Sequence, residues 1–278
     1  MSTIEKAFNK NSSDGNGDNA DRHARAALES KHGIEIDLQL MHEKGMLVPS
    51  SGRTTIAEEY RQIKRPLIKN IINQSANLGC EANLIMITSA LPGEGKTFTA
   101  VNLAMSIAME LDHTCLLIDS DVAYPFLLPR GKRKGLVDYL TDKSLELSDL
   151  MLRTNVPKLS ILPVGQGENY ATELLASGGM RDLAKELSER YHDRIIIFDS
   201  PPLLATTESR VLATLVGQVV VVVEALRTQQ SAVKQAVEYL DHDKFISFIL
   251  NKSRATAGHG YYYGYGKGYG YGDKENDK

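Results

Sequence analysis

The chain lacks the residues and runs that mark several classes of protein. It has no tryptophan, two cysteines (Cys80 and Cys115) and seven histidines without the paired spacing of a zinc site. We therefore expect no protein-ligated metal centre, and reduced thiols in a reducing compartment. The longest purely apolar run, 219–223, has five residues, whereas a membrane helix needs about 20. The formal net charge of −3 provides no global basic field, which argues against a nucleic-acid partner.

Two compositionally biased stretches flank the rest of the sequence. The N-terminal stretch is rich in Asn, Ser, Asp and Gly, and we expect a disordered segment over residues 1–32. The C-terminal stretch has six tyrosines and five glycines within 261–272, and we expect a flexible tail over 253–278. Residues 33–53 contain a short apolar patch and are predicted as a docking arm or linker. An ordered domain is then predicted over 54–252.

Apolar strands alternate with amphipathic helices within this domain. Strands are predicted at 84–88, 114–118, 159–164, 194–198, 218–223 and 245–250. Helices are predicted at 56–72, 97–111, 172–190 and 228–240, the first with a break or kink at Pro66. Several strands are apolar without alternation, so both of their faces are covered. The pattern predicts an α/β fold of three layers, with helices on both faces of a mostly parallel sheet and ligands at the carboxyl ends of its strands.

A glycine-rich segment, ALPGEGKT at 90–97, follows an apolar strand and opens an amphipathic helix, as a phosphate-binding loop requires. Glycine lets backbone amides turn toward phosphates, and the helix adds free N–H groups and the positive end of its dipole. The lysine would contact the β- and γ-phosphates of ATP, and the threonine would ligate Mg²⁺. The alternative is a simple turn before a helix, but strand, loop, Lys-Thr and helix are all in register for ATP. The predicted nucleotide-binding residues of this segment are Pro92, Gly93, Glu94, Gly95, Lys96, Thr97 and Phe98.

Aspartates follow two of the predicted strands directly. Asp119 and Asp121 come after the second strand, and Asp199 comes after the fourth. Both places are carboxyl ends of strands, where the phosphates must lie. We predict a Mg²⁺ site at Thr97, Asp119 and Asp199. Catalysis is predicted for Lys96, Asp119 and Asp121, with one acid accepting or orienting the proton of the attacking hydroxyl. Aspartate at a strand end also commonly forms a cap or turn, but the phosphate loop favours the functional interpretation.

Three motifs together resemble the bacterial tyrosine kinases of exopolysaccharide and capsule loci, which are P-loop proteins related to the septum-site and partition ATPases. The motifs are ALPGEGKT (90–97), LLIDSD (116–121) and IIIFDSPP (195–202). The resemblance implies ATP and Mg²⁺ as cofactors and tyrosine as the phosphate acceptor. One departure is that Ala123 and Tyr124 stand where the family usually has arginine after the second motif. This change removes a possible phosphate or interface contact.

The resemblance also implies an assembly. Glu58, Arg61 and Lys64 resemble the E-x-x-R-x-x-R helix with which family members form rings, although lysine lacks the planar fork of arginine. A membrane polysaccharide co-polymerase that determines chain length is implied as activator. That partner would recruit this cytoplasmic protein to the inner face of the membrane. A cognate tyrosine phosphatase is expected as well.

The C-terminal tail begins beside the predicted site. Asn251 directly follows the last predicted strand. The resemblance implies that it contacts the adenine base, and the alternative is that it caps or turns the chain. The predicted phospho-acceptors are Tyr261, Tyr262, Tyr263, Tyr265, Tyr269 and Tyr271. A tail that only associates through its aromatic side chains is the alternative. We expect a tyrosine autokinase that acts between subunits of a ring. A P-loop ATPase switch and a weakly catalytic ATP-binding scaffold stay open as alternatives.

Overall fold

The computed structural model describes residues 33–75, 81–123, 133–166, 171–191 and 193–253. The predicted N-terminal disordered segment, the tyrosine-rich tail after Ser253 and its six candidate acceptors lie outside these ranges, as does Tyr124. Within them, no helix is both long and apolar enough to cross a membrane.

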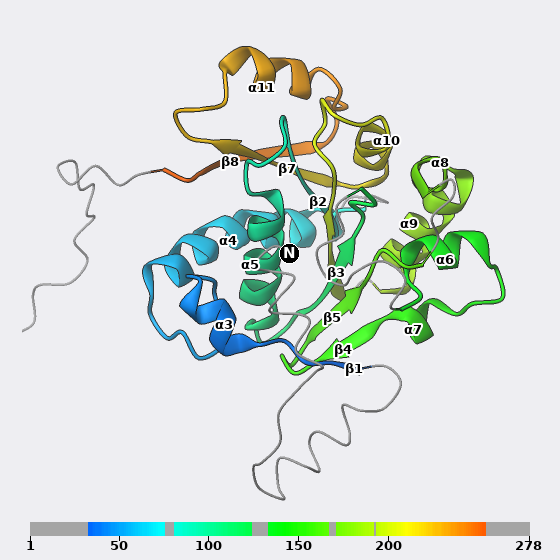
Figure 1. The fold of residues 1–278 in the computed structure, drawn as a ribbon, viewed down its shortest axis with the longest axis horizontal. Coiled ribbons are helices and arrows are strands. Elements are labelled where there is room, and N and C mark those ends of the chain that lie inside the picture. Colours follow the sequence, from blue (N-terminus) through cyan, green and yellow to red (C-terminus); the bar gives the residue numbers. More distant parts are fainter. Residues whose placement is uncertain (1–32, 76–80, 124–132, 167–170, 192, 254–278) are drawn as a thin grey trace, which may run out of the picture.

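The centre of the molecule is an eight-stranded sheet in the order β1-β4-β5-β3-β6-β2-β7-β8 (Figure 1). Neighbouring strands are parallel except β4 and β5, which are antiparallel. The strands are β1 Gly33–Ile34, β2 Leu84–Ser89, β3 Thr114–Asp119, β4 Leu152–Thr154, β5 Leu159–Leu162, β6 Arg194–Asp199, β7 Gln218–Glu224 and β8 Phe245–Asn251. All six strands predicted from the sequence are present, and the mostly parallel sheet is confirmed.

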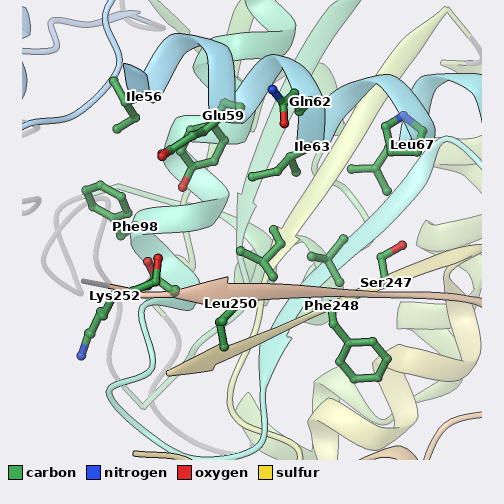
Figure 2. A pocket seen from close by; sticks show the side chains of 16 residues that line it. Ile56, Glu59, Gln62, Ile63, Leu67, Phe98, Ser247, Phe248, Leu250 and Lys252 are labelled. Carbon is green, nitrogen blue, oxygen red and sulfur yellow. The ribbon is translucent and has the colours of Figure 1, made fainter. Parts of the chain in front are cut away.

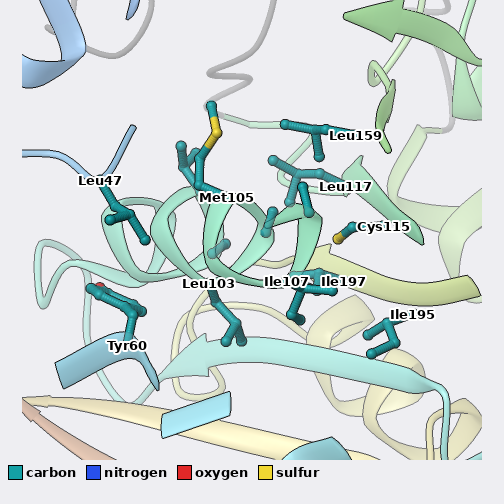
Figure 3. Packing of buried hydrophobic residues seen from close by; sticks show 14 of the residues in the cluster. Leu47, Tyr60, Leu103, Met105, Ile107, Cys115, Leu117, Leu159, Ile195 and Ile197 are labelled. Atoms are coloured by element: carbon teal, nitrogen blue, oxygen red, sulfur yellow. The ribbon is translucent and has the colours of Figure 1, made fainter. Parts of the chain in front are cut away.

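Helices cover both faces of the sheet, which confirms the three-layer fold. One face carries α3 Leu38–Glu43, α4 Thr55–Ser75 and α5 Lys96–Ala108. The other face carries α6 Leu136–Thr141, α7 Leu147–Leu150, α8 Ala171–Leu175, α9 Gly178–Arg190, α10 Glu208–Leu215 and α11 Gln230–Val237. Side chains of each strand alternate between the two layers, so Ile85 and Ile87 pack under α5 while Leu84 and Met86 face the opposite helices. Figure 3 shows the α5 layer, where Ile107 lies beside Ile197 and where Leu103, Cys115 and Leu117 belong to the same buried cluster. Both faces are therefore dry, as the unalternating apolar strands predict.

Two predicted helices differ from the structure. Helix α4 continues through Pro66 from Thr55 to Ser75, so of the predicted break or kink the break is wrong and the kink stays a prediction. Proline removes one backbone hydrogen bond, but the helix buries Tyr60, Leu67 and Ile71 on either side of it. The single helix predicted at 172–190 is two helices, α8 and α9. The Ser177 hydroxyl donates to the Leu174 carbonyl at 2.6 Å and closes the first of them before two glycines.

Residues 33–53 pack against the domain's own core. Strand β1 pairs with β4, and the Asn155 side chain hydrogen-bonds both the N–H and the carbonyl of Ile36 at 2.9 and 3.0 Å. Further along, the Leu47 N–H donates to Asn102 of α5 at 2.6 Å. The buried apolar side chains of the segment are Ile34, Ile36, Met41, Met46, Leu47 and Val48. Each contributes about 1.5–3 kcal/mol when fully buried, so the segment stabilises this domain. Docking to another chain stays a prediction for it.

Candidate nucleotide site

The phosphate loop connects β2 to α5 and adopts a backbone that requires glycine. Gly93 has φ +84° and Gly95 has φ +98°, both in the left-handed region. A Cβ at Gly95 would also collide with the amide of Asn251. Helix α5 begins immediately afterwards at Lys96. Its free N–H groups and dipole therefore face the loop, which is the arrangement that binds phosphate in other proteins.

The predicted lysine and aspartates converge at this edge of the sheet. Lys96 Nζ lies 2.7 Å from Asp121 Oδ2, and Thr97 Oγ1 donates to Asp199 Oδ2 at 2.7 Å. Asp119 and Asp199 stand opposite each other in the paired strands β3 and β6. All three aspartates are buried. The positions predicted for catalysis and for Mg²⁺ are thus brought together by three neighbouring strand ends.

Backbone pairing fixes the two acidic strand ends against each other. The Asp199 carbonyl accepts from both the N–H and the hydroxyl of Ser120, at 2.9 and 2.7 Å. The Ser200 hydroxyl then donates to the Ile87 carbonyl at 2.9 Å, and the Asp121 N–H donates to Asp119 Oδ1 at 3.3 Å. Ser120 and Ser200, which follow Asp119 and Asp199, therefore hold the ends of β3, β6 and β2 in one register.

Burial and charge perturb the ionisable groups of the site. Burial raises the pKa of Asp199 to about 6, although Lys96 and the Thr97 hydroxyl act in the opposite direction. Burial acts to lower the pKa of Lys96, but Asp199, Asp121 and Asp119 outweigh it and the pKa is raised. Lys96 is therefore charged, and it offsets part of the charge of the three carboxylates.

The donor set suits a hard cation bound together with phosphates. Asp199 Oδ1 is buried without a hydrogen-bond partner, while the other oxygen of the same carboxylate contacts Thr97. An unpartnered carboxylate oxygen beside a hydroxyl fits Mg²⁺ and its water shell. Within the described ranges, no cluster of three or more His, Cys, Asp or Glu side chains is arranged to hold a metal by itself. A magnesium ion would therefore take further ligands from the phosphates and from water.

Glu94 points away from the predicted phosphates. Its carboxylate accepts from the Leu91 N–H at 2.6 Å, from the Glu224 N–H at 3.3 Å and from the Thr228 hydroxyl. This buried side chain ties the loop to itself and to the segment after β7. The predicted nucleotide contact of Glu94 is thereby limited to its backbone. An acidic residue is unexpected in a loop that is predicted to bind phosphate. This mismatch is the sequence feature that indicates a structural role for Glu94.

The residues that precede the tail also hold the phosphate loop. Asn251 Nδ2 donates to the Glu94 carbonyl at 2.8 Å. Lys252 Nζ donates to the Gly93 carbonyl at 2.7 Å and lies 3.0 Å from Glu224 Oε2. Lys252 has φ +54°, which is unusual for a residue with a side chain. Sequence reasoning missed Lys252, because no local pattern marks a lysine that reaches back across the sheet.

Comparison with known proteins identifies the family. No protein-family model matches the chain. The tyrosine-protein kinase CpsD of Streptococcus agalactiae is 32% identical over 180 residues, which is 63% of this chain and 77% of CpsD. This chain belongs to the bacterial tyrosine-protein kinase family. The VpsO kinase domain superposes with a TM-score of 0.55 at 30% identity, over 70% of this chain and 100% of that domain. The succinoglycan biosynthesis transport protein ExoP of Rhizobium meliloti is 29% identical over 240 residues, 83% of this chain but 29% of ExoP.

A cavity of about 690 Å³ adjoins the phosphate loop of this tyrosine-protein kinase. It lies between α4 and the edge strand β8, as Figure 2 shows. Of the predicted nucleotide-binding residues, Phe98 and Asn251 line it. Phe98 is the third residue of α5, and Asn251 ends β8. The cavity therefore extends toward α4 from Phe98 and Asn251, which flank the phosphate loop.

Helix α4 carries the predicted assembly residues, and the structure separates them. Glu58 and Arg61 form an exposed ion pair one turn apart. Lys64 is buried, donates to the Ser106 carbonyl at 2.7 Å and pairs with Glu110 at 2.5 Å. This placement argues against the predicted intersubunit contact of Lys64, because its charge is used within the subunit at the end of α5. Arg65, the next residue, is exposed.

Proposed function

We propose that this chain is an ATP-dependent tyrosine autokinase that phosphorylates its C-terminal tyrosine cluster. The observation that carries the proposal is the convergence of Lys96, Thr97 and the three aspartates at the mouth of a left-handed glycine loop. That arrangement positions a triphosphate and its charge, and positioning with electrostatic stabilisation accounts for most of the catalysis in phosphoryl transfer. Membership of the kinase family supports tyrosine as the acceptor.

The roles of the side chains follow from their contacts. Lys96 would leave Asp121 for the β- and γ-phosphates, since both compete for the same ammonium. Thr97 and Asp199 would hold Mg²⁺, which neutralises the developing phosphate charge when bound. The tyrosine oxygen attacks the γ-phosphorus, the bond to the β–γ bridging oxygen breaks, and Asp119 or Asp121 takes the phenolic proton. When Lys96 moves to the phosphates, the carboxylate of Asp121 would be released to act as the general base. Nucleotide binding would in this way prepare the site for proton transfer.

The base of the nucleotide would lie on the β8 side of the loop. Phe98 and Asn251 line the adjoining cavity there. Pro92 and the backbone amides from Gly93 to Gly95 would surround the phosphates. Asn251 has a third role besides the predicted adenine contact or chain cap. Its side-chain amide donates a hydrogen bond to the Glu94 carbonyl and so stabilises the phosphate loop.

The tail could reach either its own site or that of a neighbour. Ten residues separate Asn251 from Tyr261, and a flexible chain of that length spans about 17 Å on average and about 33 Å when extended. We propose transfer between subunits of a ring in which Glu58 and Arg61 contribute to the contact. The exposure of this ion pair on α4 supports that role.

The biological setting is proposed from relatives. A relative named as a succinoglycan biosynthesis transport protein contains a segment like this chain as a minor part of its length. We propose that a separate membrane co-polymerase recruits and activates this kinase at the inner face of the cytoplasmic membrane. Phosphorylation of the tail would regulate polysaccharide polymerisation or export, and a cognate phosphatase would reverse it.

Intact mass spectrometry after incubation with Mg-ATP tests the proposal. We expect successive additions of one phosphoryl group, absent in Lys96→Met and in a variant with all six tail tyrosines changed to phenylalanine. The incubation is run with and without the cytoplasmic segment of a candidate partner. ATP turnover without any mass change, in the presence of that segment, would favour the ATPase switch. ATP binding without turnover would favour the scaffold, for which the Ala123 departure is the supporting observation.

A further inference from the structure

A second polar pocket lies at the end of the sheet opposite the phosphate loop. It has a volume of about 310 Å³ and is formed where β3 and β6 begin and where β4 turns into β5. The lining residues are Thr114, Arg153, Thr154, Val156, Pro157, Lys158, Leu159, Ser160 and Arg194. Among these described residues three are cations and none carries a carboxylate. The pocket is therefore electropositive.

Strand register brings its polar side chains to one face of the sheet. Thr114 pairs with Arg194 across β3 and β6, and Arg153 pairs with Ser160 across β4 and β5. Their neighbours in the chain point to the α5 layer instead (Figure 3). These neighbours are Cys115 after Thr114, Leu159 before Ser160 and Ile195 after Arg194. Because side chains alternate along a strand, the two hydroxyls and two guanidinium groups share the other face.

Two residues that line this pocket have a buried side-chain donor without a hydrogen-bond partner. Arg194 Nε and Thr114 Oγ1 are both buried without a hydrogen bond. The guanidinium of Arg194 is nevertheless held in place, with its carbon 4.9 Å from the centre of the Tyr191 ring and one terminal nitrogen donating to the sulfur of Met151 at 3.2 Å. Buried donors are nearly always satisfied in native proteins, by protein, water or a bound ion.

Lys158 adds a fixed charge at the rim. Its ammonium donates to the carbonyls of Glu110 and Leu111 at 2.8 and 2.6 Å, which leaves one N–H for a ligand. Its backbone has φ +66°, a conformation that side chains rarely adopt. Arg153, which also lines the pocket, is exposed. The lining thus combines three positive groups with two residues that have an unsatisfied donor.

We propose that this pocket binds a phosphate group, carried either by free phosphate or by phosphotyrosine. Guanidinium groups match the geometry of phosphate oxygens, and the hydroxyls and the ammonium supply further donors. Strand β3 runs from Thr114 to Asp119, so the pocket lies about 17 Å from the aspartates at the rise of an extended strand. The site is therefore separate from the phosphate loop, and its occupancy does not require the proposed kinase reaction.

Titration followed by NMR of the arginine side chains tests this proposal on the full chain. With inorganic phosphate, we expect the Nε–H signal of Arg194 to shift and saturate, in the wild type and equally in Lys96→Met. Sodium chloride at matched ionic strength should give no saturable shift. Binding should weaken at least tenfold in Arg153→Gln and in Arg194→Gln, and should be unchanged in Arg181→Gln, a matched exposed control on α9.

The same titration identifies the carrier of the phosphate. Tighter binding of O-phosphotyrosine than of inorganic phosphate, with no response to tyrosine, would assign the pocket to a phosphoprotein, whereas equal affinities would assign it to free phosphate. The proposal is overturned if no saturable shift occurs, if Arg153→Gln and Arg181→Gln bind alike, or if the shift disappears in Lys96→Met. Arg153→Gln is decisive here because its exposed side chain can be changed without disturbing the core.

Discussion

The carboxyl edge of the sheet and the layers beneath it are built on opposite principles. Under α5 and α9, most buried side chains are apolar and closely packed, as in the first four residues of strand β2. At the edge, three buried aspartates lie around one lysine, a carboxylate oxygen lacks a partner, and two glycines are left-handed. The layers contribute stability, whereas the edge costs stability in order to hold phosphate and metal. Substitutions at the edge should therefore lower activity, whereas substitutions in the layers should lower stability.

The largest expected effect is at Lys96. Lys96→Met should lower tyrosine phosphorylation by about 10²–10³-fold or more, because it removes a preorganised charge from the transferred phosphoryl group. Time-resolved phosphotyrosine mass spectrometry measures the change. Lys185→Met, on the exposed face of α9, is the matched control and should retain full activity. Comparable rates in the two variants would show that the edge does not hold the phosphates.

The apolar layer should respond in the opposite way. Leu187 of α9 is fully buried, far along the chain from the phosphate loop. Leu187→Ala should lower the free energy of unfolding by about 2–5 kcal/mol through lost burial and a cavity. Urea titration gives this value. At a temperature where the variant stays folded, its autophosphorylation rate should match the wild type. A stable but inactive variant would break the division between the two regions.

The next effect concerns pH and Asp199. Because burial raises the folded-state pKa to about 6, the folded protein holds this proton more tightly than the unfolded chain does. The stabilising contribution is complete below about pH 4 and is lost as pH rises to about 6. A shift of this size corresponds to about 3 kcal/mol. Asp199→Asn should therefore remove a loss of stability that the wild type shows between these pH values.

Urea unfolding of the nucleotide-free protein at several pH values measures that difference. Asp182→Asn, at an exposed position of α9, is the control and should follow the wild-type curve. If the free energies of unfolding of wild type and Asp199→Asn change in parallel from pH 4 to 7, the pKa of Asp199 is not raised in the folded protein.

The smallest effect is expected at Lys252, where the tail leaves the domain. Its side chain is 45% exposed in the pair with Glu224, so the interaction contributes at most about 1 kcal/mol. Lys252→Met should raise the KM for ATP a few-fold with little change in kcat, because the Gly93 carbonyl loses its hydrogen bond from the Lys252 ammonium. Steady-state kinetics distinguish the two parameters. Lys244→Met, which changes a half-buried lysine just before the other end of β8 that donates to the Thr214 carbonyl, should leave both unchanged.

Local sequence patterns were sufficient for six of the eight strands and for the phosphate loop, but not for the short strands β1 and β4. Each central strand is an uninterrupted apolar run, and the loop lies between a strand and a helix in a fixed spacing. The aspartates were placed at strand ends for the same reason, since parallel strands deliver their carboxyl ends to one edge. Of the break or kink predicted at Pro66, the break does not occur, because tertiary packing of α4 outweighs the local penalty of proline.

The sequence alone therefore determined the three layers and the composition of the candidate site, because hydrophobic periodicity and loop chemistry are local properties. Tertiary structure decided where the long polar side chains point. Lys64 turns into α5, Glu94 anchors the loop to Thr228, and Lys252 reaches Gly93. Such contacts join residues that are far apart in the chain, so their energies depend on the packed geometry rather than on any neighbouring pattern.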